Sequence, residues 1–90
     1  MSQVKVTVYT TKVCPYCVAA KQLLSRRGVT YEEVDVSDDH AKRQWLAETS
    51  GQRTVPQIFF GDRPIGGFSD LQQLDAESGL EAALVAASEA

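Results

Sequence analysis

The sequence predicts an α/β fold in one domain that covers residues 1–90, with strands and helices in the order βαβαββα. Two observations lead to this fold class. A strand, a helix and a second strand follow one another within about 35 residues near the N-terminus, which implies two parallel strands joined by a right-handed crossover. Two short apolar runs later in the chain, 57–60 and 63–65, are separated by Gly61 and Asp62, as in a β-hairpin.

The first strand and the first helix are separated by a change in hydrophobic period. Valines alternate with polar residues from position 4 to position 8, which predicts a strand over about 4–9, followed by a turn over 10–13. From Pro15 the spacing becomes that of an amphipathic helix. Gly28 can adopt the left-handed conformation that ends it. The inward face of this helix carries Cys17, Ala20 and Leu24.

A second strand and a second helix follow. Residues 31–36 (YEEVDV) have the pattern of a strand. The helix is expected from Ser37 to about Ser50, with Asp38 and Asp39 in its first turn and Gly51 after its end. Its inward residues are predicted to be Ala41, Trp45 and Leu46.

The C-terminal part is expected to form two helical segments after the hairpin. Ser69 and Gln72 fit an S-x-x-Q capping box for the first, whose apolar residues are Leu71 and Leu74. The second runs over about 80–87, and the helical pattern breaks near residues 78 and 79. Its inward residues are Leu80, Ala83, Leu84 and Ala87.

Composition excludes several classes of function. The chain has 9 basic and 12 acidic residues, a net charge of −3, so it lacks the basic surface that nucleic acid requires. No run approaches the roughly 18 apolar residues of a membrane span, and no signal sequence is recognisable. We therefore expect a cytoplasmic monomer. Two cysteines three positions apart cannot build a disulfide scaffold, because they close only a tiny loop.

The two cysteines, Cys14 and Cys17, stand in the motif CPYC. Proline is favoured at the first position of a helix, so Pro15 makes Cys14 the N-cap. An N-cap side chain faces free N–H groups at the positive end of the helix dipole, where a thiolate fits far better than a thiol. We therefore expect a lowered pKa for Cys14. Cys17 lies one turn deeper on the same face, close enough for a disulfide and better shielded.

A lowered pKa improves Cys14 mainly as a leaving group. A fall from about 8.5 to about 5 raises the thiolate fraction at neutral pH roughly 30-fold but lowers nucleophilicity roughly 50-fold. The motif therefore suits a redox dithiol in which another thiol displaces Cys14 from a mixed disulfide. Two other interpretations are disfavoured. A zinc site would need two more ligands, and the chain has no other cysteine and a single histidine, His40. If the two cysteines were an inert pair packed as small hydrophobic residues, the position of Pro15 at the helix start after a strand would have no function.

Three motifs occur in the order found in the glutaredoxins: CPYC at 14–17, TVPQIF at 54–59 and IGGFSDL at 65–71. From about residue 4 to residue 87 the chain resembles the small dithiol class of that family. The resemblance implies a thioredoxin-like fold, with a four-stranded mixed sheet flanked by helices. It implies reduction of protein disulfides and protein–glutathione mixed disulfides through Cys14, with Cys17 as the second thiol. Glutathione would be the reducing co-substrate, restored by glutathione reductase, with no tightly bound cofactor and no metal.

The resemblance also implies where glutathione binds. Pro56 is expected to be cis, which leaves the backbone N–H and C=O of Val55 to pair with the cysteinyl part of the ligand, with Thr54 beside them. The γ-glutamyl carboxylate is expected at the backbone N–H groups of the next helix start, and Asp70 can also accept from the ligand's ammonium group. The positions concerned are Gly67, Phe68, Ser69 and Asp70. Without the family, the glycines read as a turn and Ser69 as a helix cap.

The basic residues depart from the family pattern. Many glutaredoxins have a lysine three residues before the first cysteine, whereas this chain has Thr11 there and Lys12 next to it. Either the Lys12 side chain reaches the glutathione site, or this chain lacks the positive charge that the family lysine supplies there. Arg43 and Arg53 are further candidates for the ligand's glycyl carboxylate. Tyr16 either packs beside bound glutathione or shields Cys17.

Two rival functions share parts of this pattern. One is a glutaredoxin-like protein that is reduced by thioredoxin reductase, but that group lacks the GGxSD pattern. The other is an iron–sulfur cluster carrier built from two chains and two glutathiones. Such carriers usually have CGFS, so Pro15 and Tyr16 disfavour this role.

Overall fold

Eight elements make up residues 4–88, the part of the chain that the computed structural model describes. In chain order they are β1 (Val6–Thr10), α1 (Pro15–Arg26), β2 (Glu32–Asp35), α2 (His40–Ser50), β3 (Gln57–Phe60), β4 (Arg63–Gly66), α3 (Phe68–Ala76) and α4 (Leu80–Ser88). Within this range no helix has the length and apolar content needed to cross a membrane.

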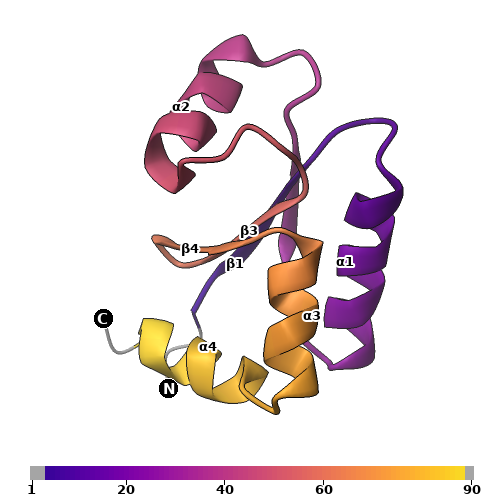
Figure 1. The fold of residues 1–90 in the computed structure, drawn as a ribbon, viewed down its shortest axis with the longest axis vertical. Coiled ribbons are helices and arrows are strands. Elements are labelled where there is room, and N and C mark those ends of the chain that lie inside the picture. Colours follow the sequence, from indigo (N-terminus) through magenta and orange to yellow (C-terminus); the bar gives the residue numbers. More distant parts are fainter. Residues whose placement is uncertain (1–3, 89–90) are drawn as a thin grey trace.

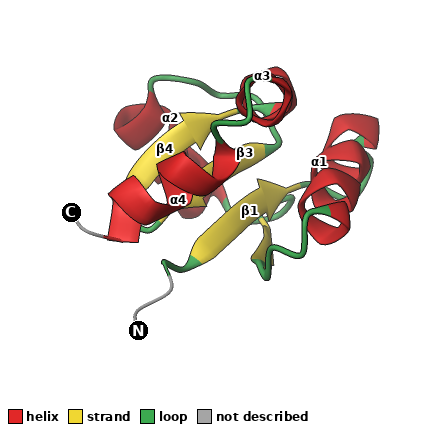
Figure 2. Ribbon diagram, turned by 90° about the horizontal axis from the view of Figure 1, so that it is seen from below, coloured by secondary structure: helices red, strands yellow, loops and turns green. Residues whose placement is uncertain are grey.

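The four strands form one mixed sheet in the order β2-β1-β3-β4. β1 is parallel to β2 and antiparallel to β3, and β3 and β4 form the predicted hairpin. Helices α1 and α3 lie side by side on one face of the sheet, and α2 lies on the other (Figure 1). Figure 2 shows α4 next to the beginning of β1. The predicted α/β class and mixed sheet are therefore confirmed.

The central strands β1 and β3 are buried on both faces because helices cover each side. The larger core lies under α1, α3 and α4 and consists of Val6, Val8, Ala20, Leu23, Leu24, Ile58, Phe60, Leu71 and Leu80. The smaller core faces α2 and consists of Tyr9, Val36, Leu46 and Phe59. Thr10, at the end of β1, is also buried. The strand thus extends one residue further than its alternating valines predicted, and residue 10 belongs to the sheet rather than to the turn.

Helix α2 begins later than predicted. Its N-cap is Asp39, whose Oδ1 accepts a hydrogen bond from the Lys42 N–H at 2.9 Å. Ser37 does not cap it, because the Ser37 hydroxyl instead accepts from the Lys12 N–H at 2.9 Å. Ala41, expected to face inward, is exposed. Gly51 ends the helix with a φ of 78°, as predicted.

Trp45 was expected in the core, but it is 40% exposed. Its ring stacks on Phe59 with 5.6 Å between centroids and lies 5.8 Å from the ring of Tyr9. The Lys42 ammonium lies over the Trp45 ring, 4.9 Å from its centroid. The indole therefore packs against the smaller core and remains partly exposed to solvent.

Helix α3 also starts differently. Its N-cap is Gly67, and the Asp70 carboxylate accepts a hydrogen bond from the Gly67 N–H at 3.0 Å, so the predicted capping by Ser69 and Gln72 is wrong. The chain can enter the helix earlier because Gly66 adopts a φ of 124°, which other residues disfavour. The predicted break between the last two helices is confirmed, and Ser78 there has a φ of 58°.

A polar network joins the end of β1 to α1 and β2. The Thr10 hydroxyl donates to the Glu33 Oε2 at 2.8 Å, and the Lys21 ammonium donates to both Glu33 carboxylate oxygens at 3.1 and 3.0 Å. The hydrogen bonds from Lys21 and from Thr10 lower the pKa of Glu33. This network holds the strand end that leads into the CPYC turn.

We expect Glu33→Gln to reduce the free energy of unfolding at neutral pH, by about 1 kcal/mol or less because the pair is partly exposed to solvent. The native pKa of Glu33 is lowered, so its stabilisation is present above the unfolded-state pKa of about 4.3 and is lost as the pH falls through the native value. Urea unfolding at about pH 7 and about pH 3 measures the difference.

The matched control is Glu32→Gln on the same edge strand, whose partner Lys5 lies 3.1 Å away at a more exposed position. Its effect should be smaller. If Glu33→Gln cost as much at acid pH as at neutral pH, the charge of Glu33 would not be the source of the stabilisation.

Candidate active site

Cys14 is the N-cap of α1, as the motif predicted. Its backbone is extended, with φ −153° and ψ 94°, and Pro15 occupies the first turn. The Cys17 N–H donates to the Cys14 Sγ at 3.1 Å. The sulfur therefore takes the place that a serine or aspartate oxygen takes at other helix starts, facing the positive end of the dipole.

The two cysteines form a disulfide, with their Cα atoms 5.2 Å apart. Cys17 is 2% exposed, whereas Cys14 is only partly buried. The prediction of an accessible first sulfur and a shielded second sulfur is confirmed. An external thiol can reach Cys14 from solvent, while Cys17 can reach only its neighbour.

The segment before β3 lies against Cys14. The Val55–Pro56 peptide bond is cis, as predicted, and the Val55 carbonyl oxygen is 3.8 Å from the Cys14 Sγ. Within residues 4–88, the N–H of Val55 makes no hydrogen bond to other backbone groups. Its side chain packs on the smaller core. Val55 therefore presents a free backbone edge next to the reactive sulfur, which is what an extended peptide needs to pair with.

The start of α3 is the third segment at this place. A Cβ atom added at Gly67 would lie 3.6 Å from the Pro56 carbonyl oxygen, and one added at Gly66 would collide with the Asp70 carboxylate. The Tyr16 and Phe68 rings lie 6.1 Å apart, so the first turns of α1 and α3 are neighbours. The backbone N–H groups of the first turn of α3 have no acceptor within the helix. Two helix N-termini therefore meet beside the disulfide.

The three basic residues predicted to bind the ligand's glycyl carboxylate lie in different surroundings. The Lys12 ammonium pairs with the Asp38 carboxylate at 3.1 Å, and both side chains are largely exposed. Arg43 is partly buried on α2 and Arg53 is exposed in the loop that precedes β3. Within the described residues neither arginine has an ion-pair partner. Thr54, Ser69 and Asp70 are exposed near the same segments.

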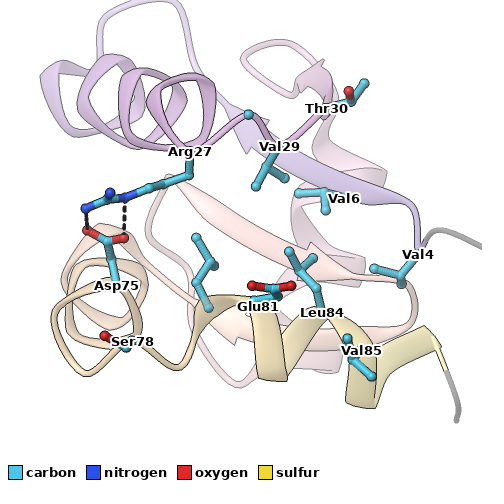
Figure 3. Close-up of a pocket in the computed structure, with 12 residues that line it drawn as sticks. Val4, Val6, Arg27, Val29, Thr30, Asp75, Ser78, Glu81, Leu84 and Val85 are labelled. Carbon is cyan, nitrogen blue, oxygen red and sulfur yellow. Dashed lines mark hydrogen bonds and ion pairs between the residues drawn. The ribbon is translucent and has the colours of Figure 1, made fainter.

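A separate groove of about 690 Å³ lies at the other end of α1 (Figure 3). Its walls include Val29 and Leu84, and the ion pair between Arg27 and Asp75 stands at its edge. No cysteine lines this groove, and none of the predicted site residues does. Over residues 4–88 no cluster of three or more His, Cys, Asp or Glu side chains is placed to hold a metal ion. The groove and the two cysteines are therefore separate features of the structure.

Three residues near the site were not predicted from the sequence to lie there, since Ser37 and Asp38 were expected only to begin the second helix. Ser37 and Asp38 hold Lys12 through its backbone and its side chain. Gln57 is buried directly after Pro56 and bonds to the loop before it. A sequence signal existed only for Gln57, because an amide in an otherwise apolar strand of the type QIFF is unusual.

Comparison with known proteins places these features in context. The glutaredoxin family model matches residues 6–65. Glutaredoxin 3 of Escherichia coli (strain K12) is 47% identical over 76 residues, covering 84% of this chain and 92% of the relative. The glutaredoxin structure from Brucella melitensis is 43% identical, with a TM-score of 0.83, and covers 93% of this chain and 91% of that one. A buckwheat glutaredoxin in complex with glutathione has a TM-score of 0.84 at 26% identity, covering 93% and 79%.

We expect the Cys14 thiol to titrate well below about pH 7, because its thiolate would accept from the Cys17 N–H at the helix start. The pH dependence of alkylation by iodoacetamide measures this pKa in the reduced Cys17→Ser variant, which has one thiol. The same variant unfolded in urea is the control and should titrate near about 8.5. A native value equal to the unfolded one would contradict the role of the N-cap.

Proposed function

Because this chain belongs to the glutaredoxin family, we propose that Cys14 is the thiol that exchanges disulfides with glutathione and with glutathionylated proteins. The chain is a glutathione-dependent thiol-disulfide oxidoreductase. The observation that carries the assignment to Cys14 is its partly exposed sulfur at the N-cap of α1, 3.1 Å from the Cys17 N–H. Cys17 is too shielded to meet a protein substrate.

In the one-thiol cycle, the Cys14 thiolate attacks the glutathione sulfur of a protein–glutathione mixed disulfide. The protein thiolate leaves and takes a proton, and glutathione is now bonded to Cys14. A second glutathione thiolate then attacks the glutathione sulfur, so that oxidised glutathione forms and Cys14 leaves as a thiolate. A helix start that stabilises the departing anion accelerates this last step.

In the two-thiol cycle, the Cys14 thiolate attacks one sulfur of a protein disulfide, the other substrate sulfur leaves as the first thiolate and takes a proton, and a mixed disulfide with Cys14 forms. The Cys17 thiolate then attacks the Cys14 sulfur, and the second substrate thiolate leaves. The product is the Cys14–Cys17 disulfide, which is the state of the structure. Two glutathione molecules reduce it in turn, and glutathione reductase restores them.

We propose that glutathione lies across the three segments that meet beside Cys14. The cysteinyl part pairs with the backbone of Val55, next to Thr54 and Pro56, because that edge is unpaired and its carbonyl is 3.8 Å from the sulfur. The γ-glutamyl carboxylate binds the free N–H groups at the start of α3, over Gly67, Phe68 and Ser69. The Tyr16 ring, which is exposed beside Phe68, covers the bound ligand.

Two details follow from the charges. Asp70 holds the Gly67 N–H with one carboxylate oxygen, which leaves the other to accept from the ligand's ammonium group. For the glycyl carboxylate we favour Arg43 and Arg53 over Lys12, because the Lys12 ammonium is already paired with Asp38. The natural setting would be the cytoplasm, where glutathione keeps thiols reduced.

The central prediction is turnover in an assay that couples the protein to glutathione, glutathione reductase and NADPH. A glutathione mixed disulfide of a small thiol is the substrate, and NADPH consumption is followed by absorbance. Cys14→Ser should reduce the rate by at least about 100-fold, because the attacking sulfur is gone. Turnover with thioredoxin reductase but not with glutathione would overturn the proposal.

Cys17→Ser should separate the two cycles. The variant should keep the rate on a small glutathione mixed disulfide within about threefold, because only Cys14 is needed there. It should lose the reduction of substrates that require both thiols, which a protein disulfide assay measures. Loss of both activities would contradict the division of roles between the two cysteines.

A further inference from the structure

Gln57 has a buried amide side chain and directly follows Val55 and Pro56, which belong to the proposed glutathione site. It is the first residue of β3, follows Pro56 and is 2% exposed. Its Nε2 donates to the Gln52 carbonyl oxygen at 2.8 Å and to the Thr54 carbonyl oxygen at 2.9 Å. Both N–H groups of the amide are therefore used, and both point at the loop that leads to Val55.

The other end of the same amide has no partner. The Gln57 Oε1 is buried and accepts no hydrogen bond from the described residues. A buried acceptor without a donor is unfavourable, and an apolar side chain of similar volume would avoid this cost. Among the described residues, the two donated bonds are thus the polar interactions that offset burial of the amide.

These two bonds hold a loop that is otherwise fixed mainly at its beginning, by the Ser50 hydroxyl. Residues 51–54 are exposed and contain no helix or strand. At the beginning of the loop the Ser50 hydroxyl accepts from the Gln52 N–H at 3.1 Å and donates to the Gln52 carbonyl oxygen at 3.3 Å, whereas the Thr54 carbonyl oxygen accepts from the side chain of Gln57 alone among the described residues. Toward its end, the carbonyls that flank Arg53 are both held by Gln57. Fixing a carbonyl on each side of a residue restricts the rotation of the backbone between them.

We infer that Gln57 is a positioning residue for glutathione, because its amide holds Arg53, Thr54 and Val55 in the orientation that binds the ligand. This inference rests on the proposed function. A loop that is ordered before the ligand arrives loses less conformational freedom on binding, which strengthens affinity. Gln57 touches neither sulfur, so its loss should weaken binding without slowing the exchange itself.

The test uses Gln57→Met, which keeps the volume and removes both N–H donors and the unpaired oxygen. We expect the KM for a small glutathione mixed disulfide to rise about fivefold in the coupled assay, as for the loss of one or two neutral hydrogen bonds. We expect kcat to stay within about twofold. Backbone ¹⁵N relaxation of the reduced protein should show lower order parameters at residues 52–55.

Two further variants sharpen the test. Gln57→Glu keeps the shape of the side chain and an acceptor but has at most one donor, so its KM should also rise. This variant replaces Gln57→Met in the test if Gln57→Met does not fold. Gln22→Met, on the exposed side of α1, is the matched control and should match the wild type.

An unchanged KM and a rigid loop in a folded Gln57 variant would overturn the inference. So would a fall in kcat at unchanged KM, because that would place Gln57 in the chemistry. If the wild type itself showed no turnover with glutathione, the proposed function would have failed instead. In that case, unchanged order parameters at residues 52–55 in Gln57→Met would still show that Gln57 does not restrict the loop.

Discussion

The pairing of β1 with β3 is the constraint on which the rest of the structure depends. Tyr9 at the end of β1 is opposite Gln57 at the start of β3, so the chain that leaves one strand lies beside the chain that enters the other. The same edge receives the end of β4, because Gly66 is opposite Ile58. Three segments that are far apart in sequence therefore meet there: the turn to Cys14, the cis-proline segment and the glycine turn. Both strands are buried on both faces, so a change of register would disrupt close packing on each side of the sheet.

The helices that follow two of these segments add their positive ends to the same place. Helices α1 and α3 run side by side (Figure 1), with contacts between their first turns at Tyr16 and Phe68. Their far ends are joined by a two-pronged ion pair, in which Arg27 donates to Asp75 at 2.6 and 3.0 Å and lowers the pKa of that carboxyl. The Arg27 side chain is largely exposed, whereas that of Asp75 is partly buried. Two parallel dipoles suit a reaction whose species are a thiolate and a carboxylate.

The polar groups buried near this edge have a common effect. Thr10 joins the end of β1 to Glu33 and Lys21, and Gln57 joins the start of β3 to its preceding loop. Thr10 holds the strand end that leads into the CPYC turn, and Gln57 holds the irregular backbone that leads into β3. The thioredoxin-like fold thus places strands and helices behind Cys14, while the short loops next to it are the segments to which we propose that substrate binds.

Local signals in the sequence determined the CPYC helix start, the hairpin, the order of the elements and the break before α4, because proline, glycine and hydrophobic period act over a few residues. The resemblance to the glutaredoxins supplied the cis bond at Pro56. Tertiary structure alone decided the start of α2 at Asp39, the cap of α3 by Gly67 and Asp70, the half-exposed Trp45 and the pairing of Lys12 with Asp38. It also decided that Gln57 faces inward onto its own loop. These features depend on which segments meet across the sheet. The spacing of residues along the chain does not indicate which distant segments will be in contact.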